Sequence, residues 1–262
     1  MSTLTAPFAG NLHTEWIKLR SLRSTWYTVA GLFVVGLGMT VLSMSAAGNE
    51  WASATAAERA AWDPTARSLM TFIVAQLIIS VLGILIVTSE FATGLIQTSL
   101  TGTPRRHRLL AAKLVVTVAV AAVAGLGLML AAFGIGQAML AAQDVPSAAL
   151  GDPGVLSALA AGGIYLSAIA LLAAALGAII RATAGALATM VGIVFLVPAL
   201  AGLVPSGLQG IFHYWPTLGA TAALTTVPDP AHPHPWLNLG GMCLGIAAVV
   251  AVAFVVFRRR DI

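Results

Sequence analysis

Charged side chains are scarce in this sequence. Lysine and arginine contribute 13 residues and the acidic residues nine, together 8% of the 262-residue chain, whereas soluble domains carry about 25%. Hydrophobic residues make up 59%, and the mean hydropathy is +0.95. These values exclude an ordinary soluble globular domain and indicate a chain that lies largely in lipid.

Cysteine and the common motifs of catalysis are also rare or missing. The single cysteine, Cys243, excludes an intramolecular disulfide. The sequence contains no Gly-Lys pair and therefore no P-loop, so ATP-driven activity would need a nucleotide site on another polypeptide. His232 and His234 stand between prolines in what reads as a plain exposed loop, so we expect no metal site. We expect no catalytic or cofactor site either, because the loops offer no Ser/His/Asp, Cys/His or paired-carboxylate arrangement. The net charge of +4 is not gathered on one face, so a nucleic acid partner is not expected either.

What the chain has instead is apolar runs long enough to cross a membrane. A spanning helix needs about 20 residues, and none of the runs shows the alternation of a barrel strand. The predicted fold is therefore an all-α, polytopic membrane protein forming one membrane domain over residues 1–262. Its six predicted spans are residues 27–47, 69–88, 114–141, 155–180, 184–204 and 237–257.

The basic residues give the predicted orientation. Alternate connections hold 11 of the 13 lysines and arginines, and the other three connections hold only Arg59 and Arg67. By the positive-inside rule both termini face the cytoplasm, in a multi-pass protein of the cell membrane. A cleaved signal peptide is the rival interpretation of the first span, because "SMSAAG" offers small residues after an apolar core. The long basic region before this span and the length of its apolar run favour retention.

An amphipathic helix is predicted before the first span, over residues 11–25. Leu12, Trp16, Leu19 and Leu22 share one face, which suits the membrane surface. The predicted interfacial anchor consists of Trp16, Lys18, Arg20 and Arg23. The alternative is a solvated segment that only sets the orientation.

The most charged stretch, residues 89–113, reads "SEFATGLIQTSLTGTPRRHRLLAAK". Thr103 can cap a new helix with Pro104 in its first turn. The arginines that follow would then oppose the helix dipole, which indicates a role in orientation, in binding lipid headgroups or in contacting a partner. Glu90 is not needed for orientation; it could be solvated, pair with a nearby arginine or contact a partner protein.

A second amphipathic helix is predicted in the extracellular loop, residues 205–236. In "SGLQGIFHYWPTL", Leu208, Ile211, Phe212 and Trp215 stand at i, i+3, i+4 and i+7, and Pro216 ends the pattern. This helix could cap a pathway or only anchor the loop.

In the order of "EWIKLRSLRSTW", "VTSEFATGLIQTSLTGTPRRHRLLAAK" and "LGAIIRATAGALA", the whole chain resembles the permease subunit of bacterial ATP-binding-cassette exporters of the type-2 class, in the small six-span form. The resemblance implies a separate ATPase subunit, a homodimer or a related permease chain as partner, and ATP-driven export. It also implies that residues 89–113 form a coupling segment. By that likeness the residues that couple to the ATPase are Glu90, Thr93, Gly94, Arg105 and Arg106.

Two alternatives stay open from the residues themselves. The chain could be a non-transporting membrane scaffold or sensor whose basic segments recruit soluble proteins or anionic lipid. A secondary carrier is disfavoured because no charged residue lies at the middle of a predicted span, where coupling ions usually bind.

The predicted orientation is testable by chemical labelling. Cysteines introduced by Arg105→Cys or Arg260→Cys should react with a membrane-impermeant thiol reagent only after cells are opened. Arg59→Cys, on the opposite side, should react in intact cells. Labelling at position 105 or 260 from outside intact cells would show that the orientation is wrong.

Overall fold

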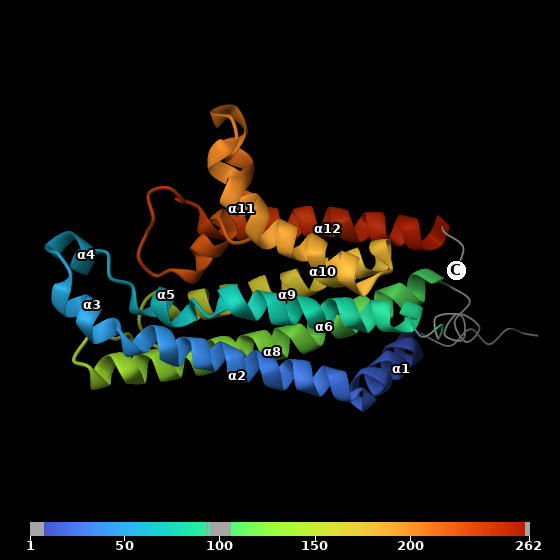
Figure 1. The fold of residues 1–262 in the computed structure, drawn as a ribbon, viewed down its shortest axis with the longest axis horizontal. Coiled ribbons are helices and arrows are strands. Elements are labelled where there is room, and N and C mark those ends of the chain that lie inside the picture. Colours follow the sequence, from blue (N-terminus) through green and yellow to red (C-terminus); the bar gives the residue numbers. More distant parts are fainter. Residues whose placement is uncertain (1–7, 93, 95–105, 260–262) are drawn as a thin grey trace, which may run out of the picture.

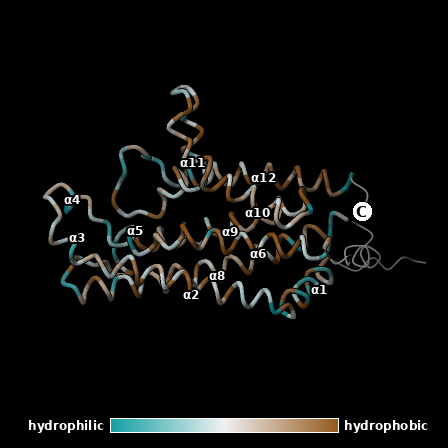
Figure 2. The backbone as a smooth tube through the Cα atoms, in the orientation of Figure 1, coloured by the Kyte–Doolittle hydropathy of each residue, from teal (hydrophilic) through white to brown (hydrophobic). Residues whose placement is uncertain are grey.

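The computed structural model describes residues 8–92, 94 and 106–259, and this part of the chain is helical with no strand. Among these residues, six helices are long and apolar enough to cross a membrane, which confirms the predicted all-α, polytopic fold. Apart from the end of the fifth span, they lie side by side along the long axis of the molecule (Figure 1), and hydrophobic residues cover most of their length (Figure 2).

The short helix α1 (Phe8–Ser21) precedes the spans and is not one of them. Five spans are built on the long helices α2 (Arg23–Ser45), α6 (Phe72–Ala92), α8 (Arg106–Ala142), α9 (Val155–Ile180) and α12 (Pro235–Arg259). Between α2 and α6 lie α3 (Ala47–Ser53), α4 (Ala56–Ala60) and α5 (Pro64–Leu69). The fifth span consists of α10 (Thr183–Val191), η1 (Gly192–Leu196), α11 (Val197–Leu200) and η2 (Ala201–Leu203), and η3 (Ser206–Tyr214) and η4 (Gly219–Leu224) follow it.

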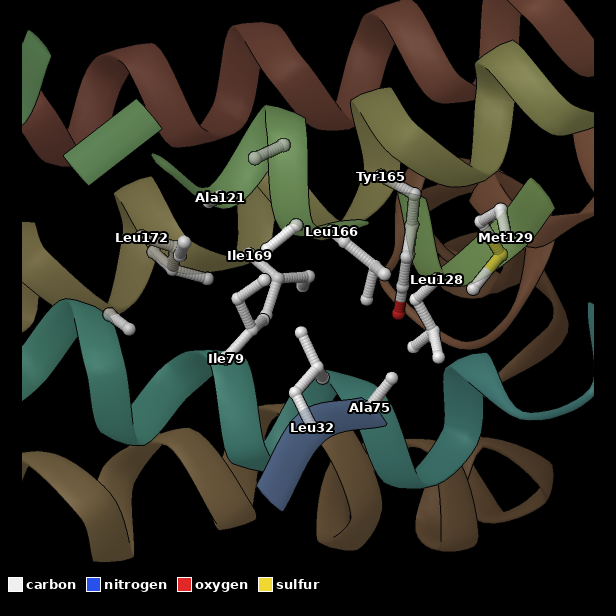
Figure 3. Close-up of a cluster of buried hydrophobic side chains, with 14 of the residues drawn as sticks. Leu32, Ala75, Ile79, Ala121, Leu128, Met129, Tyr165, Leu166, Ile169 and Leu172 are labelled. Atoms are coloured by element: carbon white, nitrogen blue, oxygen red, sulfur yellow. The ribbon is translucent and has the colours of Figure 1, made fainter. Parts of the chain in front are cut away.

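The centre of the bundle is α9, which packs against α6, α8 and α12. Small residues let these backbones approach closely: a Cβ atom on Gly83 of α6 would lie 2.3 Å from the carbonyl oxygen of Ala170 in α9. Larger apolar side chains, among them Ile79, Leu166 and Ile169, fill the space on either side (Figure 3). Lipid tails are as apolar as these side chains, so close packing of this kind is what favours helix association in a bilayer.

The fifth span is not a continuous α-helix. Pro198 has no backbone N–H to donate to the carbonyls of Ile193 or Val194, and the span passes through a π-helical turn at Gly192–Leu196. The loop after η3 satisfies both carbonyls: Trp215 Nε1 donates to Ile193 O (2.8 Å) and Thr217 Oγ1 donates to Val194 O (2.7 Å). Beyond this break the chain projects sideways from the bundle at α11 (Figure 1).

The loop before the last span differs from the predicted amphipathic α-helix. Residues Ser206–Tyr214 form a 3₁₀ helix, with three residues per turn. Leu208 and Ile211 therefore share one exposed side, whereas Phe212 and Trp215 are only half exposed and pack edge to face, with ring centroids 6.3 Å apart. Trp215 lies after the helix, where its indole binds the broken span.

A buried carboxylate joins the two large loops at this end of the bundle. Asp63 caps α5 by accepting from Ala66 N (2.8 Å). Its carboxylate also accepts from Thr226 Oγ1 (2.9 Å), from Val227 N (2.9 Å) and from Thr226 N. The entry to α6 is thus tied to the connection between η4 and α12.

Removing this carboxylate should loosen that connection. In Asp63→Ala, three backbone N–H groups and one hydroxyl lose their acceptor, and we expect a loss of about 3 kcal/mol in stability. The measurement is thermal unfolding of the purified protein in detergent. Asp144→Asn, at an exposed left-handed position that asparagine tolerates, is the matched control and should unfold like the wild type.

Candidate functional site

Four charged side chains meet at the end of the bundle where α1 and the C-terminal end of α12 lie, here called the basic end (Figure 1). Lys113 of α8 donates from Nζ to Glu15 Oε2 of α1 (2.7 Å) and to Glu90 Oε1 at the end of α6 (2.6 Å). Lys18 of α1 contacts Glu15 Oε1 (2.9 Å) and Glu90 Oε1 (3.1 Å). We call these four residues the ion-pair cluster.

The ion-pair cluster is balanced in charge, and three of its four residues are buried. Lys113 is 3% exposed, and the side chains of Glu15 and Glu90 are 5% and 11% exposed. Burying one such charge without a partner costs roughly several kcal/mol. The cluster avoids this cost because its two lysines are paired with two glutamates. Each helix is consequently held by a charge on another helix.

Lys18 lies at the edge of the cluster, with 37% of its side chain exposed. Partial burial opposes its charge, but the hydrogen bonds and negative charges of Glu15 and Glu90 outweigh that effect and raise the pKa of Lys18 above its ordinary value. When folding raises the pKa of a lysine, the resulting stabilisation is fully present at any pH below the pKa that the lysine has in the unfolded chain. It is lost only as the pH rises through the higher pKa of the folded protein. Lys18 therefore stays charged, and its contacts persist, throughout the neutral range.

The side of α1 that is buried in the structure differs from the apolar face that the sequence predicted. Asn11, Glu15 and Leu19, spaced by four residues, form its buried side, and α1 packs against α8. Trp16 points outward and is 45% exposed. The helix also ends at Ser21, because Leu22 is extended (φ −80°, ψ 117°), so the predicted helix 11–25 is two helices with a corner between them.

The structure brings together only some of the residues that the sequence singled out. Glu90 and Lys18 share the ion-pair cluster, and Glu90 pairs with lysines rather than with an arginine. Gly94 follows four residues later in a left-handed conformation (φ 72°), which glycine adopts readily. Arg20 and Arg23 are exposed, and Arg106 is the first described residue of α8. Thr93 and Arg105, like the capping pair Thr103 and Pro104, lie outside the described residues.

Sequence reasoning missed Glu15 and Lys113, although a signal was present. The chain has only two lysines against 11 arginines, and both lysines belong to the cluster. An ammonium group is a compact charge with three donors, so it can lie between two carboxylates, whereas the planar guanidinium suits a single bidentate partner. Lysine at positions 18 and 113 was therefore the clue.

Apolar packing fixes the cluster to the rest of the bundle. Leu110 and Leu114 of α8 pack with Val87 of α6 and Phe257 of α12 in one buried group that also includes small residues of α9. One acceptor is left over: Glu90 Oε2 is buried and has no hydrogen-bond partner in the described part of the chain. The base of the segment between α6 and α8 is thus rigid, yet it retains one unused acceptor.

Charge balance within the cluster can be tested with a double-mutant cycle. Lys113→Met leaves two buried carboxylates facing only Lys18, and we expect it to lower the free energy of unfolding by about 3–5 kcal/mol. Adding Glu90→Gln restores the balance and should recover roughly 1 kcal/mol or more. Thermal unfolding in detergent is the measurement, with Arg258→Met, at an exposed cation of the same end, as the control. A double variant less stable than Lys113→Met would contradict the balance argument.

Comparison with known proteins places the sequence in a family. No curated protein matches the chain. The family described as ABC-2 family transporter protein matches residues 11–199, a stretch that contains all four residues of the ion-pair cluster and the first five spans up to the break at Pro198. The match covers well over half of the sequence and agrees with the six-span helical architecture. The chain therefore belongs to the ABC-2 family of transporter proteins, a membrane component of ABC transport.

Proposed function

We propose that the chain is the permease subunit of an ABC exporter, energised by a separate ATPase subunit that binds the segment between α6 and α8. The observation that carries the proposal is the Glu90–Lys113 ion pair (2.6 Å). Glu90 lies near the end of α6, just before the segment begins, and Lys113 lies in α8, just after the segment ends. The ion pair therefore joins the two helices that flank the segment. A partner that moved the segment would move both helices together.

The packing supports transmission of such a movement. From Glu90, α6 runs as one helix of 21 residues, about 30 Å at 1.5 Å per residue, back to the loop that Asp63 ties to residues 226–227. Along the way α6 packs closely on α9 through Gly83. A push at the basic end would therefore reach the opposite end through a single rigid element.

At the opposite end, a connected set of hydrogen bonds links α6 and α9 to the fifth span and would respond to such a push. Tyr165 of α9 donates to Gln76 Oε1 of α6 (2.6 Å) and accepts from Thr217 N (3.2 Å). Thr217 in turn binds the broken fifth span at Val194. These hydrogen bonds run from Gln76 through Tyr165 and Thr217 to a carbonyl in the fifth span. Movement of α6 against α9 would strain them. We infer that opening of the outer side of the pathway occurs here, in an assembly of two permease chains.

Coupling can be separated from folding by measuring both in one variant. Glu90→Gln keeps the side-chain shape but leaves Lys113 and Lys18 sharing the carboxylate of Glu15, so its thermal unfolding in detergent is measured beside its activity, at a temperature where the variant stays folded. Co-purified with the ATPase encoded beside it, this variant should retain the ATPase but lose about tenfold of the permease-dependent ATP hydrolysis, about 1.4 kcal/mol of coupling. Arg258→Gln, an exposed cation at the same end, is the matched control and should behave like the wild type.

Charge reversal in the segment tests the docking itself. Arg105→Glu combined with Arg106→Glu should abolish co-purification of the ATPase. Wild-type co-purification and wild-type hydrolysis in both this variant and Glu90→Gln would show that the proposed coupling role is wrong.

A further inference from the structure

A groove at the basic end has the form of a lipid site. It occupies about 330 Å³ between α1, the first three turns of α2 and α8, a volume within the range of small-ligand pockets. Its wall is almost entirely apolar, with Val29 and Phe33 from α2 facing Val120 and Val123 from α8. Val123 is 76% exposed, so the groove opens sideways, where lipid would surround the bundle.

The polar side chains that line the groove, Thr25 among them, come from one corner, here called the mouth of the groove. Arg20, Trp16 and Trp26 lie there, at the corner where α1 ends and α2 begins. Trp26 Nε1 donates to Arg20 O (2.9 Å), which fixes the indole across the corner although Trp26 is 56% exposed. Tryptophan with one apolar and one polar side is favoured at the depth of lipid headgroups. The mouth is therefore preorganised at the membrane surface.

The charge at the mouth is free to bind a ligand. The neighbouring cation, Lys18, is occupied by Glu15 and Glu90. Arg20 is exposed and takes part in none of the ion pairs formed by the described residues. A guanidinium binds a phosphate group through two parallel hydrogen bonds. The groove thus presents an unneutralised phosphate-binding group directly above an apolar channel.

We propose that this groove binds one anionic phospholipid of the adjacent leaflet. Its phosphate would pair with Arg20 between the two indoles, and one acyl chain would lie between α2 and α8. A free inorganic anion would leave the apolar channel unfilled, and a zwitterionic lipid would gain less from the single positive charge. The bound lipid would hold α1 in its seat, because Arg20 stands on the same helix as Glu15 of the ion-pair cluster.

Native mass spectrometry of the full-length protein, titrated with phosphatidylglycerol and with phosphatidylcholine, tests the site. We expect one tightly retained phosphatidylglycerol and about a fivefold preference for it over phosphatidylcholine, the contribution of one basic side chain. Arg20→Gln should abolish the preference. Arg23→Gln removes the same charge three residues away at a residue that does not line the groove, and it should leave the preference intact.

A second variant tests the apolar part of the groove. Ala119 is exposed and lines the channel, so Ala119→Leu should fill it without disturbing the core and lower retention of both lipids. Equal retention of the two lipids by the wild type, or an equal loss in Arg20→Gln and Arg23→Gln, would overturn the proposal in favour of general attraction between the basic end and the lipid surface. ATP hydrolysis does not enter these measurements, so their outcome is independent of the proposed transport function.

Discussion

The ammonium group of Lys113 is the point on which the basic end of the bundle depends. It is buried in a bundle of largely apolar helices, and a buried cation is stable only when negative charge lies close to it. The two carboxylates that oppose it stand on different helices, at Glu15 and Glu90. One atom thereby fixes the relative positions of α1, α6 and α8. Apolar packing alone could not specify this arrangement so sharply, because lipid competes equally well for apolar surfaces.

The polar contacts of the structure follow a pattern along the bundle. Strong ones lie where helices leave the apolar zone: the ion-pair cluster at one end, and Asp63 with the Thr217 hydrogen bonds at the other. Between them the helices meet mainly through small and apolar side chains, as at Gly83 and Ala170, with few directional bonds such as that from Thr71 Oγ1 to Gly36 O (2.7 Å). Packing of this kind lets helices slide or tilt slightly, while the polar ends keep their register. Such a construction suits a protein that moves between a few defined states while remaining in the membrane.

The sequence predicts the six long apolar helices of the described residues, because the length and hydropathy needed to cross a bilayer are properties of the local sequence. It does not predict the ion-pair cluster, because Glu15 and Lys18 are three residues apart and read as an ordinary pair on a helix surface. Lys113 contacts a glutamate 98 residues away, and no local periodicity encodes that contact. The break in the fifth span is a different case. Pro198 signalled it, but the surrounding run was apolar enough to read as one continuous helix.

The corner at Leu22 gives two cations of α1 different roles. Lys18 lies against two carboxylates, whereas Arg20, two residues later, lines the groove that we propose binds lipid. The chemistry of the two groups suits these positions, a compact ammonium between carboxylates and a planar guanidinium for phosphate. Because both stand on one short helix, whatever holds Arg20 also restrains Glu15 and, through Lys113, the base of the segment between α6 and α8. Under both proposals, the lipid composition of the membrane would change how tightly the base of this segment, on which the ATPase would act, is held.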